Sequence, residues 1–162
     1  MSMTTAIIEP EVSDYELERG KPMPDLNHSI IQSNMLFSLR VKTQKRFSIL
    51  PEINVRLLKR DRVPDLAIYA TLNFEPRHNQ LVMTQPPLCA IEILSEMQKL
   101  SDLMTKNDEY FEAGVLSYWL VLPHLQSIYV FHTADEYDVF TRKDILKDKV
   151  LDIELDLGEI FN

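Results

Sequence analysis

The chain has 162 residues, of which 45% are hydrophobic and 26% are charged, and this composition suits one globular domain with a substantial core. The formal net charge is -8, no apolar run approaches the roughly 18 residues that cross a bilayer, and we expect neither a membrane span nor a secretory signal. Cys89 is the only cysteine, which excludes an internal disulfide or a cysteine-based zinc site and favours a reducing, cytoplasmic setting.

We expect residues 1–14 to form a loose lead-in and residues 15–162 to form a single domain. That domain is predicted to begin with a short strand and a helix. Residues 15–17 suggest a short strand that ends at Gly20 and the turn-prone segment after it. A helix is predicted over residues 28–47, with Asp25 or Asn27 as its cap. Apolar side chains recur in it at helical spacing, and basic residues gather near its C-terminal end.

After this helix the apolar pattern changes to a period of two, which is typical of strands. Strands are predicted over residues 48–59 and 62–70, the second interrupted at its start by Pro64, and a polar loop over residues 73–80. Residues 86–95 form a short apolar run, as expected for a central strand buried on both faces.

The C-terminal half is predicted to contain one helix and several strands. The helix covers residues 100–114, with Ser95 or Ser101 as candidate cap and Gly114 as its stop. The strands cover residues 116–123, a hairpin over 127–134 and 136–142, and a strand over 151–157 with one wet face. The predicted fold is therefore α/β (α+β), with a mixed central sheet flanked by helices.

Three residues suggest chemistry on this sheet. Glu92 lies inside an apolar strand, where a carboxylate is costly unless it is paired or bound to a metal. Asp65 begins another mostly apolar strand, and Lys106 shares a helical face with Asp102 and Tyr110. Carboxylates can bind Mg²⁺, and a Mg²⁺ site with a lysine beside it can catalyse the hydrolysis of phosphodiesters. The alternatives are a Glu92 bonded to a backbone amide or an arginine, and a solvated Lys106 paired with Asp102.

Other features admit simple structural explanations. Basic residues gather between Arg40 and Arg62, which is compatible with nucleic-acid contact but is more often a solvated surface. The four histidines lack metal-ligand spacing, and His28 is expected to form local hydrogen bonds. The glycines form no phosphate-binding loop, so no nucleotide cofactor is expected.

The ordered set of motifs resembles the Uma-type restriction endonuclease family, a branch of the PD-(D/E)XK superfamily. The opening YELERG, the strand VPDLAI and the long segment from IEILSEMQKLSD to AGVLSYWLVLP are similar to that family. The resemblance implies a restriction-endonuclease-like core that cuts DNA. It implies Asp65 and Glu92 as ligands of Mg²⁺, with Mn²⁺ as a substitute, Lys106 as a relocated catalytic lysine and Glu16 as an additional acid. A homodimer is compatible with cutting both strands of a duplex.

The sequence departs from the family pattern at two places. Lys21 stands after the opening glycine, where the family often has an acidic residue. The residues Ser95, Glu96 and Met97 replace the usual Ser-Pro-Ser beside the expected metal site. These departures and the net charge leave a second hypothesis open, in which the nuclease fold serves as a binding or interaction module without catalysis.

Overall fold

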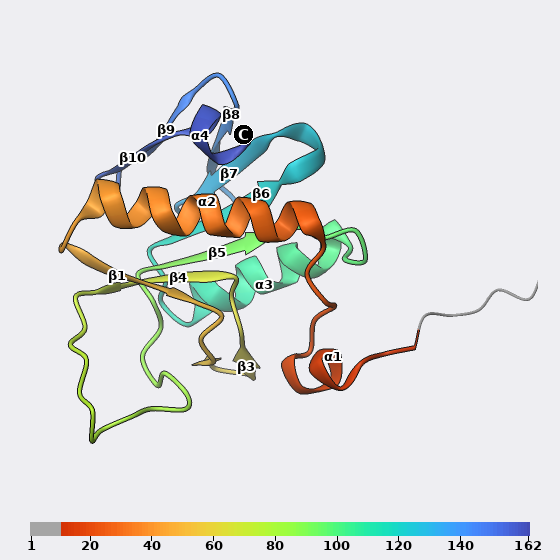
Figure 1. Cartoon of the computed structure of the whole chain (residues 1–162), viewed down its shortest axis with the longest axis vertical. Helices are drawn as coiled ribbons and strands as arrows, with labels where there is room; N and C mark the ends of the chain where they lie inside the picture. The colour runs from red at the N-terminus through yellow and green to blue at the C-terminus, as the bar shows by residue number, and fades with distance from the viewer. Residues whose placement is uncertain (1–10) are drawn as a thin grey trace, which may run out of the picture.

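The computed structural model describes residues 11–162, and its centre is a six-stranded mixed sheet (Figure 1). The strands, in their order across the sheet, are β1 (Phe47–Pro51), β4 (Leu66–Ala70), β5 (Cys89–Ile93), β6 (Ser117–Leu122), β7 (Ser127–Phe131) and β8 (Tyr137–Thr141). Strands β5 and β6 are parallel, and every other neighbouring pair is antiparallel. The mixed central sheet predicted from the sequence is confirmed.

Two helices cover the two faces of this sheet (Figure 1). Helix α2 (Leu26–Thr43) buries Met35 in the same hydrophobic cluster as Ile91 of β5. Helix α3 (Leu100–Glu112) buries Tyr110 in a second cluster with Ala90, the neighbour of Ile91 in the strand. Since successive strand residues point to opposite faces, β5 is enclosed on both sides, as its apolar run predicted.

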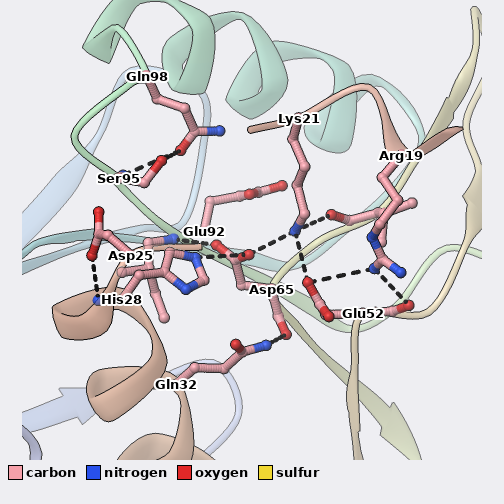
Figure 2. A network of polar contacts seen from close by, with 12 residues as sticks. Arg19, Lys21, Asp25, His28, Gln32, Glu52, Asp65, Glu92, Ser95 and Gln98 are labelled. Carbon is pink, nitrogen blue, oxygen red and sulfur yellow. Dashed lines mark hydrogen bonds and ion pairs between the residues drawn. The ribbon is translucent and has the colours of Figure 1, made fainter. Parts of the chain in front are cut away.

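Helix α2 begins where its cap predicted. The Asp25 side chain accepts a hydrogen bond from the His28 amide at 2.8 Å, which satisfies one of the free donors at a helix start. The helix ends at Thr43, four residues before the predicted end at residue 47, because Gln44 adopts a positive φ of 50° and turns the chain into β1. At the other end of α2, His28 contacts Asp65, the residue just before β4 (Figure 2).

The prediction of one long strand over residues 48–59 is wrong. The chain bends at Glu52, whose φ is 51°, and β1 ends at Pro51. A small separate sheet follows, in which β2 (Val55–Arg56) pairs with β3 (Asp61–Arg62). The predicted interruption before β4 is present, since residues 63–65 join β3 to β4 without strand structure. At the bend, the Glu52 amide donates to the Asp65 carbonyl at 3.2 Å, just before the start of β4.

The N-terminal segment is helical where the sequence suggested a strand. Residues 15–17 lie in α1 (Asp14–Arg19), so that prediction is wrong. Ser13 and Glu16 form a reciprocal capping box, and Gly20 ends the helix in the left-handed conformation with φ 66°. These local hydrogen bonds outweigh the weak strand signal. Residues 1–10 of the expected lead-in lie outside the described residues, and Ser13 and Asp14 already belong to the start of α1.

Helix α3 spans nearly its predicted range, but its cap differs. Lys99 is the N-cap residue, rather than Ser95 or Ser101, and the Asp102 carboxylate accepts the Lys99 amide at 3.4 Å. Gly114 follows the helix with φ 102°, a conformation that glycine adopts at little cost, as its predicted role as a stop requires. The chain then enters β6 beside β5, so α3 is the crossover of a parallel strand pair.

The C-terminal strands match the sequence pattern. Strands β7 and β8 form the predicted hairpin, and β10 (Ile153–Asp156) alternates buried and exposed residues as predicted. The chain also contains a short turn η1 (Pro123–Leu125), β9 (Ile145–Asp148), which pairs with β10, and α4 (Leu157–Ile160). Among residues 11–162, no helix combines the length and the apolar character that crossing a bilayer requires.

Candidate active site

Asp65 and Glu92 come from adjacent strands at the same level of the sheet. Leu66 of β4 pairs with Ile91 of β5, so one step further along the antiparallel ladder residue 65 lies opposite residue 92. Asp65 is 2% exposed and Glu92 is fully buried. The Asp65 Oδ2 atom also accepts the Ile93 amide at 2.7 Å, which ties the start of β4 to β5. Buried carboxylates at this position need partners.

The partners of Glu92 come from α3. The Lys106 Nζ atom lies 3.3 Å from Glu92 Oε2, and the Tyr110 hydroxyl donates to Glu92 Oε1 at 3.0 Å. The two partners are four residues apart and share the helix face that packs on the sheet. Lys106 is only 6% exposed, which excludes the simple reading of a solvated lysine paired with Asp102. Asp65 and Lys106 therefore flank Glu92 from strand and helix.

The partners of Asp65 come from the segment before α2 and from α2 itself (Figure 2). The Lys21 ammonium donates to Asp65 Oδ1 at 2.7 Å and to the Val63 carbonyl at 3.1 Å, and it lies 3.5 Å from Glu52 Oε1. The His28 Nε2 atom lies 3.1 Å from the same Asp65 oxygen. The sequence predicted a local hydrogen bond for His28, but its side chain instead contacts Asp65, which is 37 residues away in the chain.

A further layer of contacts fixes these groups. The Arg19 guanidinium contacts the Glu52 carbonyl at 3.3 Å and its carboxylate at 3.4 Å, and the Gln32 side chain donates to the Asp65 carbonyl at 2.9 Å (Figure 2). The space left beside Lys21, His28 and Asp65 has a volume of about 10 Å³, room for roughly one water molecule. The groups around Asp65 are therefore held closely together.

The charges of the site shift the pKa values of the two acids in opposite directions. Burial raises the pKa of Asp65, but the hydrogen bond from His28 and the Lys21 charge outweigh it, and the pKa falls from 3.8 to about 2. Burial is also the largest effect on Glu92 and raises its pKa, the Asp65 charge adds to this, and Lys106 offsets only part of it. Asp65 is therefore the more acidic of the two carboxyl groups.

Lys21 is protonated in this environment. Burial by itself lowers the pKa of its ammonium, but the carboxylates of Asp65, Glu92 and Glu52 and the hydrogen bond to Asp65 raise it above its usual value of 10.5. Two ammonium groups, those of Lys21 and Lys106, thus lie among the carboxylates of the site.

Glu16 lies apart from the other three predicted site residues in its contacts. Its carboxylate accepts hydrogen bonds from the amide and hydroxyl of Ser13, at 2.7 and 3.0 Å, and from the Met23 amide at 3.3 Å. These bonds close the α1 capping box and fasten the following segment to the helix. In the structure Glu16 therefore stabilises the local conformation next to the segment that carries Lys21.

Sequence reasoning did not place Lys21 and Glu52 in the site. In the sequence Lys21 is visible only as a departure from the family pattern, and its position after Gly20 is the one signal that points to it. The alternation of Glu52 with apolar neighbours predicts a continuous strand, whereas the chain bends at Glu52 and its carboxylate lies 3.5 Å from Lys21. Both residues enter the site through contacts between segments distant in sequence.

Part of the basic strip between Arg40 and Arg62 is neutralised by ion pairs. Arg62 makes two hydrogen bonds with Glu109 of α3 at 2.6 and 2.9 Å, and Arg60 lies 3.6 Å from the same carboxylate. Arg56 pairs with Asp61 at 3.2 Å. These contacts favour a structural use of this part of the strip, which links β3 to α3.

The oxygen atoms of the site suit a hard divalent cation in kind. Carboxylates of Asp65 and Glu92 and a backbone carbonyl are the donors that Mg²⁺ prefers. The Lys21 ammonium already lies among three such oxygens, which shows that the position favours positive charge. Within residues 11–162, however, no three or more His, Cys, Asp or Glu side chains are grouped as metal ligands. A metal ion would have to compete with Lys21.

The fold and the family are shown by comparison. A crystal structure described as "a putative nuclease belonging to DUF820", from Anabaena variabilis ATCC 29413, superimposes with a TM-score of 0.76 at 22% identity, over 86% of this chain and 83% of that one. The family model Uma2, described as "Putative restriction endonuclease", matches residues 6–158. The chain therefore belongs to the Uma2 family, as its motifs predicted. No curated protein matches it in sequence.

Proposed function

We propose that the protein hydrolyses phosphodiester bonds in DNA at the site formed by Asp65, Glu92 and Lys106. The observation that carries the proposal is the convergence of these groups, since Glu92 is fully buried in β5 and Lys106 reaches it from α3 at 3.3 Å. Membership of a family described as restriction endonucleases supports DNA as the substrate class. The proposal also includes a domain over residues 15–162 and a homodimer with two active sites.

In this mechanism Asp65 and Glu92 would hold a divalent ion, Mg²⁺ or Mn²⁺. When bound, such an ion neutralises charge on the phosphate and lowers the pKa of an attacking water. Lys106 would orient the attacking water and offset negative charge on the phosphate. Tyr110 donates its hydroxyl hydrogen bond to Glu92 and keeps one carboxylate oxygen in place. Glu16 supports the site indirectly, through the segment that it fastens.

One observation favours a second candidate function, a nuclease fold that binds a partner without cutting. The Lys21 ammonium lies 2.7 Å from Asp65, and the space beside it is about 10 Å³, too small for a phosphate group. A protein that keeps this arrangement permanently would bind no divalent ion at Asp65. The two candidates differ in whether the site accepts metal and turns over DNA.

Supercoiled plasmid incubated with purified protein and Mg²⁺ or Mn²⁺ tests the proposal directly. We expect nicked or linear product, with the rate reduced at least about 100-fold in Glu92→Gln and in Lys106→Met. Glu154→Gln is the matched control, because Glu154 is exposed on β10 and pairs only weakly with Lys147 at 3.9 Å. Cleavage that Glu92→Gln leaves unchanged would place the active site elsewhere.

A wild-type protein that leaves the plasmid intact with either ion would support the second candidate. Calorimetric titration with Mn²⁺ then separates an inactive protein that binds metal from one that does not. Saturable binding that is lost in Asp65→Asn locates the ion at the site even without cleavage.

A further inference from the structure

The Lys21 ammonium has the surroundings of a bound cation. Its Nζ atom lies 2.7 Å from Asp65 Oδ1, 3.1 Å from the Val63 carbonyl oxygen and 3.5 Å from Glu52 Oε1. These oxygens come from two carboxylates and one peptide group, which are ligands typical of a hard metal ion. The Glu92 carboxylate also lies on the side of the site that Lys21 enters (Figure 2).

The Lys21 ammonium is buried and therefore depends on these oxygen atoms for its stability. Its side chain is 8% exposed, and a buried ammonium is stable only when carboxylates and carbonyls replace its water shell. The segment that carries it is anchored on both sides: Gly20 ends α1, Arg19 is bonded to Glu52, and α2 begins after Asp25. The backbone thus delivers the lysine to one defined place.

We propose that the Lys21 ammonium acts as a tethered cation that occupies the position between Asp65, Glu52 and the Val63 carbonyl, so that a divalent metal enters the site only by displacing it. Lys21 therefore sets the metal affinity of the protein and keeps the site closed in the absence of metal. This inference rests on the proposed metal position at Asp65, and it does not require that the protein cut DNA.

Two positive charges cannot share this small space without strong repulsion. A cavity of about 10 Å³ beside Lys21 holds roughly one water molecule, so a divalent ion with its bound waters does not fit while the ammonium remains. The repulsion between the ammonium and a divalent ion a few ångströms away is large in a buried environment. Removing the lysine charge should therefore strengthen metal binding, although it also removes a partner of Asp65.

Calorimetric titration of the full chain with Mn²⁺ tests this inference without any DNA. We expect Lys21→Met to bind Mn²⁺ at least about tenfold more tightly than the wild type, because one competing charge is gone. Lys21→Arg keeps the charge and should bind as weakly as the wild type. Lys59→Met is the matched control, since it removes the same side chain from an exposed position paired with Glu112. Equal or weaker binding by Lys21→Met overturns the inference.

A second measurement uses the wild-type protein and does not depend on the folding of a variant. Amine acylation followed by peptide mass spectrometry reports how exposed the Lys21 ammonium is. Lys21 should react slowly without metal and several-fold faster in millimolar Mn²⁺, while the exposed Lys59 reacts equally in both conditions. A Lys21 reaction rate that Mn²⁺ does not change overturns the inference.

The double variant Lys21→Met/Asp65→Asn locates the ion. It should lose the gain in Mn²⁺ affinity, whereas a gain that persists would assign the ion to other ligands and overturn the inference. The outcome for DNA cleavage is separate: a Lys21→Met protein that binds Mn²⁺ tightly but leaves plasmid intact would contradict the proposed nuclease function and leave the role of Lys21 supported.

Discussion

Lys106 and Glu92 lie on different elements, yet Lys106 Nζ is 3.3 Å from Glu92 Oε2. The reason is topological, because α3 is the crossover between the parallel strands β5 and β6 and returns across the face to which Glu92 points. The position two residues after Glu92, where the simplest form of the motif has its lysine, holds Leu94. The helix therefore supplies an amine that the strand lacks.

Lys106→Met should raise the pKa of Glu92 further. Burial raises the pKa of Glu92 above 4.5, and the Lys106 charge opposes this shift, so its loss leaves the carboxyl more easily protonated. Because the folded-state pKa is raised, the contribution of Glu92 to stability is present at low pH and is lost as the pH rises through that pKa. The variant should therefore lose more stability at pH 8 than at pH 5.

Carbon-detected NMR titration of the glutamate carboxyls measures the first effect, and urea unfolding at the two pH values measures the second. Lys147→Met is a suitable control, because Lys147 is an exposed residue of β9. A Glu92 pKa that Lys106→Met leaves unchanged would mean that the two groups do not interact.

Asp65→Asn should destabilise the fold strongly. The substitution removes the negative charge that satisfies Lys21 and His28, and it leaves a buried ammonium without its main counter-ion. Breaking a buried ion pair in this way costs about 3–5 kcal/mol of unfolding free energy. Urea unfolding at neutral pH measures the loss. Asp61→Asn, in a solvent-exposed pair with Arg56, should change stability by less than about 1 kcal/mol.

The effect of Asp65→Asn should depend on pH. The folded-state pKa of Asp65 is about 2, below its usual value of 3.8, so the ionised carboxylate contributes stability above pH 3.8. This contribution is lost as the pH falls from 3.8 toward 2. The difference in unfolding free energy between wild type and Asp65→Asn should therefore shrink over that interval, and a constant difference would contradict the lowered pKa.

Arg62→Lys should weaken the attachment of β3 to α3. The Arg62 guanidinium makes two hydrogen bonds with Glu109, at 2.6 and 2.9 Å, and a lysine can replace only one of them. We expect a loss of about 1 kcal/mol in unfolding free energy. Arg56→Lys, at an exposed ion pair, should cost less than about 0.5 kcal/mol. Equal losses in the two variants would show that the bidentate geometry contributes nothing.

Asp148→Asn tests whether metal binding responds to any buried acid. The Asp148 carboxylate accepts hydrogen bonds from Ser117 and Trp119 and from the amides of Val150 and Leu151, and it is 1% exposed. Loss of this network should cost about 2–4 kcal/mol in unfolding free energy. Mn²⁺ affinity at 25 °C should remain that of the wild type, and a change would mean that Asp148 contributes to the metal site.

The sequence alone determined the elements with strong local signals. The apolar run around Glu92 predicted a strand buried on both faces, and Gly114 marked the end of α3. The same pattern singled out Glu92, because a carboxylate in an apolar strand is costly without a partner, and the family resemblance assigns Asp65 and Lys106 to the same site. These inferences hold because hydrophobic periodicity and helix-ending conformations depend on residues close in sequence.

Only the tertiary structure decided which charged groups meet. The bend at Glu52 and the helix at α1 bring Glu52 and Lys21 to Asp65, and no local pattern encodes contacts between segments 44 residues apart. Glu16, which the resemblance assigns to the site, accepts hydrogen bonds from Ser13 and Met23. Charge interactions depend on distance in space and on burial, so their strength is set when the chain packs, and a sequence pattern leaves the pairing of a buried carboxylate open.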